Sequence, residues 1–303
     1  MEYSTITELV ELARKQGTAV SEIVLQVEVE DGDASREQVI RKMKESLEVM
    51  KQAINSGQHQ RQRSDSGLSG GDARRLAVTP LTSFLMNKNS ENQSPPDSLY
   101  NRVTVNALAV AEVNADMGRI VAGPTAGSSG IVPGVVLAIG EHLELTESQL
   151  LQGLFTASGL GSVVARQATL SGAEGGCQAE CGVASAMAAG AAVELLGGSP
   201  EQVGHGFSLA LKNMLGLVCD PVAGLVEVPC VKRNGFAATH ALTAASLALA
   251  GIESVIPADE VIEAMVSVGD MLPGSLKETA LGGLAATPTG LQFKEKLSGG
   301  IDN

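Results

Sequence analysis

The sequence predicts a mostly α-helical fold, in which many helices form one compact domain, and three observations support this. Aromatic residues make up only 2% of the 303 residues, Trp is absent, and Gly occupies 35 positions. Apolar residues recur at helical spacing in many segments, whereas the strict alternation typical of strands is scarce. Gly-rich breaks separate stretches rich in Ala, Val and Leu. Small side chains let helices pack closely, so we expect several nearly all-apolar helices in a shared core.

The N-terminal part, residues 1–56, is predicted to be helical. Residues 4–17 place Ile6 and Leu9 on one face, and residues 35–55 carry a longer apolar stripe that follows a candidate cap, Ser35. Residues 57–100 are polar and rich in Gly and Ser, so we expect a loop-rich connection there, which includes "SGLSGGDA" at 66–73 and "NKNSENQSPPDS" at 87–98.

Residues 101–292 are predicted to form the helical core of the chain. "TESQL" and "SPEQV" are typical helix starts, and "LLGGSP" is a typical helix stop. Residues 293–303 are predicted to be a polar tail. The helices expected in the core span residues 101–117, 131–141, 147–166, 178–196, 201–215, 235–251 and 258–268.

Charge and hydropathy exclude several classes of partner. The formal net charge of −13 argues against nucleic acid and anionic membranes as ligands. The N-terminus has no apolar signal core, so we expect a cytoplasmic protein. Two windows, 120–140 and 235–252, contain no Asp, Glu, Lys or Arg, and the first is long enough to cross a bilayer. The first is broken by Pro124 and Pro133, and the second is interrupted by His240, so both are interpreted as core segments.

The four cysteines are the first candidates for chemistry. Cys177 and Cys181 lie in "EGGCQAECG", where helical spacing would put both thiols on one face, and a double Gly would place Cys177 at the helix start. Cys219 and Cys230 lie in "GLVCDPVAGLVEVPC", beside prolines that predict turns. Each could equally be a small buried hydrophobe. The gaps of 4, 38 and 11 residues fit no zinc ribbon, whereas scattered thiolates can hold a [4Fe–4S] cluster.

A second candidate is the Gly- and hydroxyl-rich stretch "GPTAGSSGIVPG", residues 123–134, which leads into an apolar segment. Free N–H groups and hydroxyls at a helix start suit a carboxylate or phosphate, although an ordinary helix cap has the same composition. No Ser/His/Asp arrangement and no H-E-x-x-H motif is present. The histidines are interpreted as surface or core residues. The polar residues that we consider as substrate contacts are Asn114, Thr125, Ser128, Ser129, Lys232, Arg233 and Asn234.

The motifs "GCQAECG", "GLVCDPVAGLVEVPCVKRN", "EVNADMGRIVAGPTAGSSGIVPGVV" and "KETALGGLAATPTG" together resemble the α chain of bacterial iron–sulfur-dependent L-serine dehydratase. The resemblance runs from about residue 20 to residue 292. It implies that Cys177, Cys219 and Cys230 bind a [4Fe–4S] cluster, cradled by Gly/Pro turns. Cys181 stands where the family needs no cysteine, so it is interpreted as a core thiol or one next to the ligands, although it could replace Cys177. No cysteine follows Cys230 to close the fourth iron.

The resemblance also implies a partner. In single-chain members of the family, an α/β domain precedes the helical one and contributes substrate-binding residues. Nothing in this sequence matches that domain, so we expect an α subunit that needs a β subunit. The general base is not identifiable here and is expected on the partner chain.

The implied reaction converts L-serine to pyruvate and ammonia, and an open iron acts as Lewis acid for the leaving hydroxyl. Three thiolates suit this role better than four, because a fourth would close the iron to substrate. The alternatives are β-elimination on cysteine or threonine, a zinc-stabilised helical module without catalysis, and an electron-transfer protein with four thiolate ligands.

Overall fold

The computed structural model of the chain describes residues 2–32, 34–59, 64–78 and 98–299. These residues form helices and connecting loops without a strand, and an isolated bridge pairs Cys219 with Lys277. The predicted all-α class is therefore confirmed. The helices of more than one turn are α1 (Ile6–Gln16), α2 (Val20–Asp31), α3 (Arg36–His59), α4 (Asp72–Val78), α6 (Leu99–Ala115), α7 (Ile131–His142), α8 (Glu147–Gln167), α10 (Val183–Leu195), α11 (Pro200–Lys212), α12 (Cys230–Leu249), α13 (Ala258–Met271) and α14 (Pro288–Gly299).

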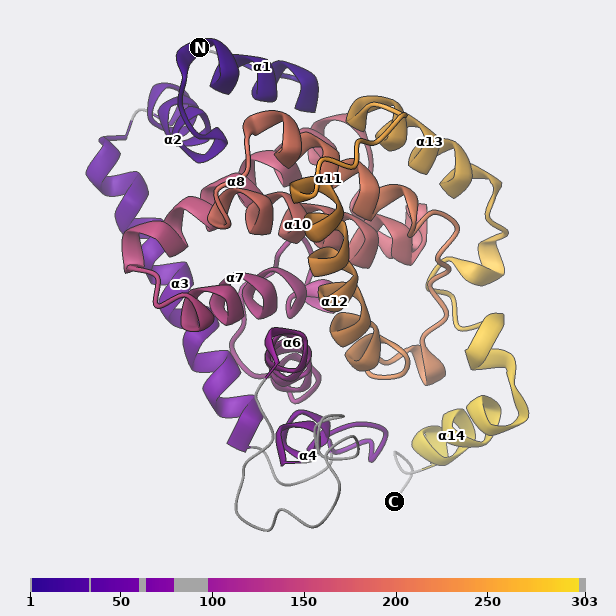
Figure 1. Ribbon diagram of the computed structural model, residues 1–303. Helices are drawn as coiled ribbons and strands as arrows, with labels where there is room; N and C mark the ends of the chain where they lie inside the picture. Colours follow the sequence, from indigo (N-terminus) through magenta and orange to yellow (C-terminus); the bar gives the residue numbers. More distant parts are fainter. Residues whose placement is uncertain (1, 33, 60–63, 79–97, 300–303) are drawn as a thin grey trace.

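Helix α10 lies at the centre of the molecule, packed against α7, α8, α11 and α12 (Figure 1). Every residue from Val183 to Val193 is buried. The helices approach closely because of glycine: a Cβ on Gly190 would come 2.3 Å from a methyl of Leu160. This core matches the predicted small-residue helices and leaves little room for a larger side chain.

Local sequence fixes several helix starts. Thr146 and Ser199 each accept a hydrogen bond from a backbone N–H three residues on and form capping boxes, as their motifs predict. Three other helices are capped by carboxylates from distant parts of the chain. Asp259 accepts from the Ile6 N–H of α1 (2.8 Å), Glu194 from the Ser21 N–H of α2 (3.3 Å), and Glu112 from the Asp72 N–H of α4 (2.6 Å).

The structure corrects or extends four expectations about secondary structure. Helix α2 is an additional helix between those expected at 4–17 and 35–55, within the N-terminal part predicted to be helical; burial of Ile23 and Val24 outweighs the low helix propensity of its β-branched residues. Helix α4 lies within the predicted loop. Helix α12 begins at Cys230 rather than at residue 235. Helix α14 extends to Gly299, so the start of the predicted tail is helical. The predicted connection 87–98 lies outside the described residues except for Ser98, which caps α6.

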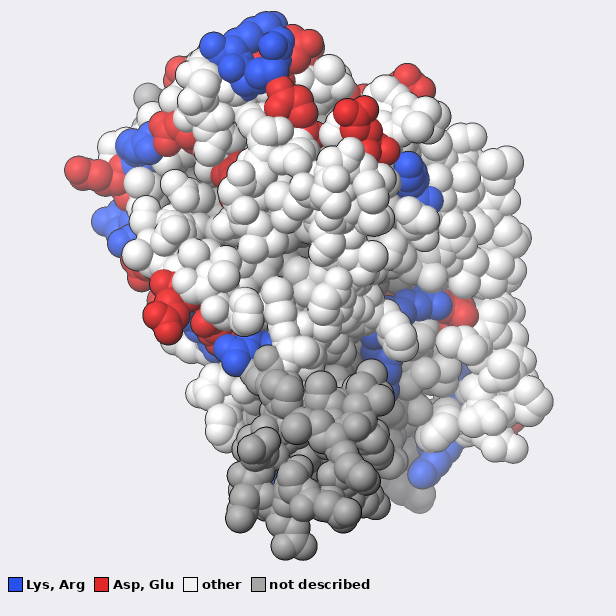
Figure 2. Space-filling model, in the orientation of Figure 1, with Lys and Arg blue, Asp and Glu red and all other residues white. Residues whose placement is uncertain are grey.

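No helix within the described ranges is long and apolar enough to cross a membrane. The window at 120–140 is divided between a loop and the buried helix α7, in agreement with its interpretation as core. The window at 235–252 covers most of α12, of which one side is buried and the other is exposed, with Phe236 77% exposed. On the face shown in Figure 2, charged side chains of both signs lie in small groups, and no broad basic patch is visible.

Candidate functional site

Cys177 precedes a short π-helical turn, Gln178–Gly182, which continues into α10. Fully buried Gln178 fixes this turn. Its backbone N–H donates to the Leu217 carbonyl (3.0 Å), and its side-chain amide donates to the Met265 carbonyl (2.9 Å) and accepts from the Gly216 N–H (2.9 Å). One side chain therefore ties the Cys177 turn to α13 and to the segment that leads to Cys219.

Cys219 is held mainly by its backbone. Its N–H donates to the Leu276 carbonyl (2.9 Å), and its carbonyl accepts from the Glu278 N–H (2.8 Å). Gly172 lies against its side chain: a Cβ at this position would come 3.0 Å from the Cys219 sulfur. The thiol is buried, in a pocket that requires glycine beside it.

Cys230 is the first residue of α12, whereas the sequence analysis placed it in a turn. Its carbonyl accepts from the Asn234 amide (2.9 Å), and the same amide donates to the Gly127 carbonyl (2.8 Å). The Asn234 oxygen accepts from the Gly130 N–H (2.9 Å). Asn234 is buried and ties the Cys230 turn to the hydroxyl-rich turn, and its contact with substrate stays a prediction.

Arg233 connects the two ends of the Cys219–Cys230 loop. Its guanidinium donates to the Val218 carbonyl (2.8 Å) and to the Asp220 carboxylate (2.9 Å), the two residues that flank Cys219. The Asp220 carboxylate also accepts from the Leu284 N–H (2.8 Å). These contacts place a cation beside the thiols, and the contact of Arg233 with substrate stays a prediction.

The thiols lie close enough to affect one another's protonation. A hydrogen bond from Cys181, followed by the charge of Arg233, lowers the pKa of Cys177. Burial and the Cys177 thiolate raise the pKa of Cys230 to about 12, and the same two causes raise the pKa of Cys219. The Cys177 hydrogen bond and burial raise the pKa of Cys181 well above its usual value. The three predicted ligands therefore form one group, with Cys181 bonded to one member.

Glu180 is a member of this group that the sequence analysis missed. One carboxylate oxygen accepts from the Thr125 hydroxyl (2.8 Å), and the other accepts a long hydrogen bond from the Cys219 thiol (3.9 Å). Burial, and to a smaller extent the nearby charge of Glu278, raise the pKa of Glu180. Its partners Thr125 and Cys219 lie 55 and 39 residues away in the chain, so no local pattern marks Glu180 as part of the site.

The remaining predicted contacts are divided between two places. Ser128 shares a hydrogen bond with the Thr125 hydroxyl (3.1 Å), and Ser129 is buried beside it. Together they form the hydroxyl turn next to Glu180. Lys232 is instead paired with Asp72 (2.6 Å), and Asn114 is half-buried in the last turn of α6. These two were predicted as substrate contacts, and neither has a side-chain contact with a cysteine or with Glu180 among the interactions described.

Backbone strain is concentrated around Cys219. Three non-glycine residues have positive φ in this area: Ala223 (55°) in the loop between the cysteines, and Glu278 (61°) and Ala280 (53°) directly after the Leu276–Cys219 pairing. Such conformations cost about 1–3 kcal/mol each and are retained where the surroundings enforce them, often at functional sites.

Could these residues hold a metal group? Within the described residues, no set of three or more His, Cys, Asp and Glu side chains could hold a single metal ion. A single zinc ion needs its sulfurs at about 2.3 Å from one point, whereas each thiolate of a [4Fe–4S] cluster binds a different iron. Two buried thiols, Cys177 and Cys219, and the half-buried Cys230 lie on three segments, with glycine where a Cβ would crowd Cys219, and this set fits a cluster better than an ion.

The sequence model of the family "Serine dehydratase alpha chain" matches residues 15–285. The chain belongs to this family. It is 47% identical to a probable L-serine dehydratase alpha chain of Bacillus subtilis, over 98% of this chain and 96% of that protein. It is 40% identical to the L-serine dehydratase alpha chain of Peptoniphilus asaccharolyticus, over 96% and 97% of the two chains. With L-serine dehydratase 2 of Escherichia coli the identity is 35%, and the match covers 93% of this chain but only 61% of that enzyme.

Proposed function

We propose that this chain is one subunit of an enzyme that converts L-serine to pyruvate and ammonia. The proposal is supported by the names of its relatives and, in the structure, by one observation. Cys177, Cys219 and Cys230 lie together with the Glu180 carboxylate and the Thr125 hydroxyl turn. This combination offers ligands for a metal group and polar contacts for a small amino acid.

Cys177, Cys219 and Cys230 would hold a [4Fe–4S] cluster, which when bound supplies an open iron as Lewis acid for the serine hydroxyl. Arg233 supports this thiolate set because it is a fixed positive charge beside Cys177. Cys181 donates a hydrogen bond to Cys177 and is not needed as a ligand. With these three ligands, one iron of the cluster would be left without a protein ligand and open to substrate.

Glu180 and the hydroxyl turn would bind the serine substrate. The Glu180 carboxylate is the acceptor for the α-ammonium, and the Thr125 hydroxyl orients it. The hydroxyls of Ser128 and Ser129, which lie ahead of the start of α7, suit the substrate carboxylate. These contacts hold the Cα–H and the hydroxyl in a fixed relation, which is most of what a β-elimination needs from the protein.

The group that removes the Cα proton is proposed to come from a β subunit in the cytoplasm. His240 is hydrogen-bonded to the Ala210 carbonyl (2.9 Å), and His205 accepts from the Ser254 N–H (3.2 Å). Neither of these hydrogen bonds involves a cysteine. The match covers only 61% of the Escherichia coli relative, so part of that enzyme lies outside the matched region. A second chain in that place would complete the site.

The decisive experiment measures iron, acid-labile sulfide and zinc in the chain purified without oxygen. About four iron and four sulfide per chain are expected. Serine, cysteine and threonine are then compared as substrates with the β subunit present, and serine should give the highest kcat/KM. Zinc without sulfide after reconstitution would contradict the proposal and favour a structural metal site. Four thiolate ligands with reversible reduction would favour electron transfer.

A further inference from the structure

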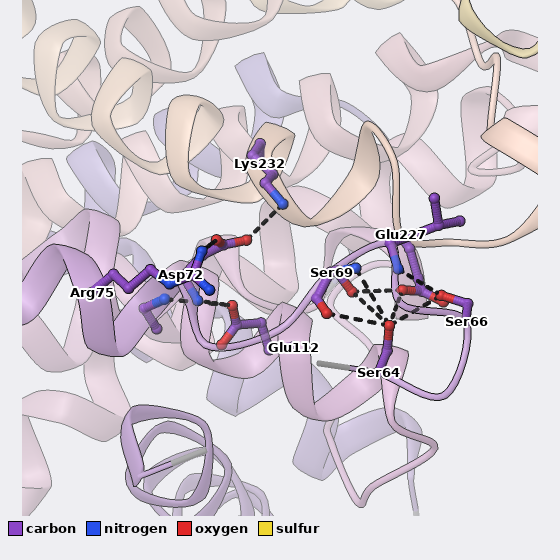
Figure 3. A network of polar contacts seen from close by, with 10 residues as sticks. Ser64, Ser66, Ser69, Asp72, Arg75, Glu112, Glu227 and Lys232 are labelled. Atoms are coloured by element: carbon purple, nitrogen blue, oxygen red, sulfur yellow. Dashed lines mark hydrogen bonds and ion pairs between the residues drawn. The ribbon is translucent and has the colours of Figure 1, made fainter. Parts of the chain in front are cut away.

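A polar network outside the cysteine group links a predicted loop to the chain around Cys230 (Figure 3). The hydroxyls of Ser64 and Ser69 both donate to the same oxygen of Glu227, at 2.5 and 2.6 Å. The Ser64 N–H donates to the Ser69 carbonyl (2.9 Å) and closes the loop on itself. All three side chains are buried, with at most 7% of their surface exposed.

The same loop has a second attachment at its other end. Asp72 follows the loop and begins α4, and its carboxylate forms an ion pair with Lys232 (2.6 Å). Its backbone N–H donates to the buried carboxylate of Glu112 (2.6 Å), which fixes the start of α4 on α6. Figure 3 shows both attachments, with Glu227 and Lys232 reaching the segment from the two sides of the α12 start.

Glu227 and Lys232 flank Cys230 closely in the chain, three residues before it and two residues after it. The Glu227 carbonyl also accepts from the Val231 N–H (2.9 Å), so the turn that carries Glu227 is bonded to the first turn of α12. We infer that the segment Ser64–Asp72 is a clamp that positions Cys230, through Glu227 on one side and Lys232 on the other. Ser64, Ser69 and Asp72 are then positioning residues, because they act through their partners.

The physical reason is the cost of an unsatisfied buried carboxylate. Without the two serine hydroxyls, the Glu227 oxygen would lose both of its side-chain donors within the described structure. A charged group that cannot be satisfied inside turns toward water and takes its backbone with it. Because the Glu227 carbonyl caps the Val231 N–H, that movement opens the first turn of α12, where Cys230 lies.

The test uses the full-length chain without iron, so it does not depend on the cluster. Alkylation of each cysteine by iodoacetamide is followed by mass spectrometry, and Cys219 is the internal reference. In S64A/S69A, we expect Cys230 to react roughly tenfold faster than in wild type, with Cys219 unchanged, as for loss of hydrogen bonds to a charged group. The matched control is S66A, because Ser66 contacts Ser64 and the Leu68 N–H but not Glu227.

A second variant guards against loss of folding in the double mutant. Asp72→Asn keeps the side-chain shape but removes the ion pair with Lys232, and Lys44→Met is its control because Lys44 pairs with Glu147 elsewhere. Faster alkylation of Cys230 alone in D72N supports the clamp. Equal acceleration at Cys219 and Cys230, or none in either variant, would overturn it.

The inference gains its functional meaning from the proposed cluster, and the two can fail separately. If wild type binds no iron or sulfide, the proposed function fails, while the alkylation rates still decide whether the clamp exists. If wild type binds the cluster, S64A/S69A should release it to a ferrous chelator several times faster than S66A. An unchanged release rate would contradict the clamp and leave the cluster assignment intact.

Discussion

Cys219 and Cys230 lie at the two ends of one short loop, yet the structure holds them in different ways. Cys219 is paired on both sides of its peptide with Leu276 and Glu278, and Gly172 lies against its sulfur. The Cys230 carbonyl accepts a hydrogen bond from the Asn234 amide. Its neighbours Glu227 and Lys232 are held by side chains from the segment at 64–72.

The difference indicates which changes each thiol should tolerate. Backbone pairing depends little on side-chain identity, so the Cys219 position should be sensitive mainly to crowding at Gly172. Side-chain anchoring depends on each partner, so the Cys230 position should be sensitive to substitutions that are remote in the sequence. Arg233 joins the two ends, because it starts from α12 and reaches both neighbours of Cys219.

The largest effect is expected when either thiol is removed. Cys219→Ala and Cys230→Ala should each lose the cluster and serine dehydratase activity together, measured as iron and sulfide content and as pyruvate formed. Cys181→Ala is the matched control, since Cys181 is buried one turn after Cys177 and is not a proposed ligand. An active Cys219→Ala enzyme would contradict the ligand assignment. Loss of the cluster in Cys181→Ala would indicate that Cys181, rather than Cys177, is the ligand.

The next largest effect is expected when Arg233, which connects the Cys219 and Cys230 ends of the loop, is replaced. Arg233→Met would leave Asp220, whose side chain is only 4% exposed, without its cation. Breaking a buried ion pair from one side costs about 3–5 kcal/mol. We therefore expect a drop of about 3 kcal/mol in the free energy of unfolding in urea. Arg36→Met, which removes a more exposed pair with Glu22, should cost under about 1 kcal/mol. Similar losses in both variants would contradict a special role for Arg233.

A smaller effect should separate the two thiols directly. In Gly172→Ala, the new Cβ would lie 2.5 Å from a Glu180 oxygen and 3.0 Å from the Cys219 sulfur. Overpacking of this kind costs about 1–3 kcal/mol, and here it should displace Cys219 more than Cys230. Alkylation of the iron-free chain measures this as a change at Cys219 alone. Gly274→Ala, with no atom within 4 Å of its Cβ, is the control.

The smallest effect concerns the pH dependence of folding stability and Glu112, which accepts from the Asp72 N–H at the end of the clamp. Burial, with a contribution from Asp72, raises the pKa of Glu112. Its contribution to folding stability is therefore complete below the unfolded pKa of about 4.3 and is lost as the pH rises through the higher folded value. Glu112→Gln should flatten the pH dependence of urea unfolding over that window. An unchanged slope would show that Glu112 titrates alike in both states.

Several parts of the fold were readable from local sequence. The capping motifs at Thr146 and Ser199 gave the right helix starts, and the Ala-rich stretch after Cys181 gave the buried helix α10. Helix α2 received no bounds of its own within the helical N-terminal part, because burial rather than propensity makes it helical. The start of α12 at Cys230 was missed because Pro229 suggested a longer turn. Both differences arise where tertiary contacts outweigh local preference.

By itself, the sequence determined the helical class, the small-residue core, and the cysteines and hydroxyl turn as the stretches that carry chemistry, because periodicity, caps and motifs are local properties. Only the tertiary structure decided the rest. It placed Glu180 against Thr125 and Cys219 and joined Ser64 to Glu227 across 163 residues. It also bonded Asn234, Arg233 and Lys232 to distant parts of the chain. A side chain's partners depend on which segments pack together, and that is settled by burial over the whole chain rather than by its neighbours in sequence.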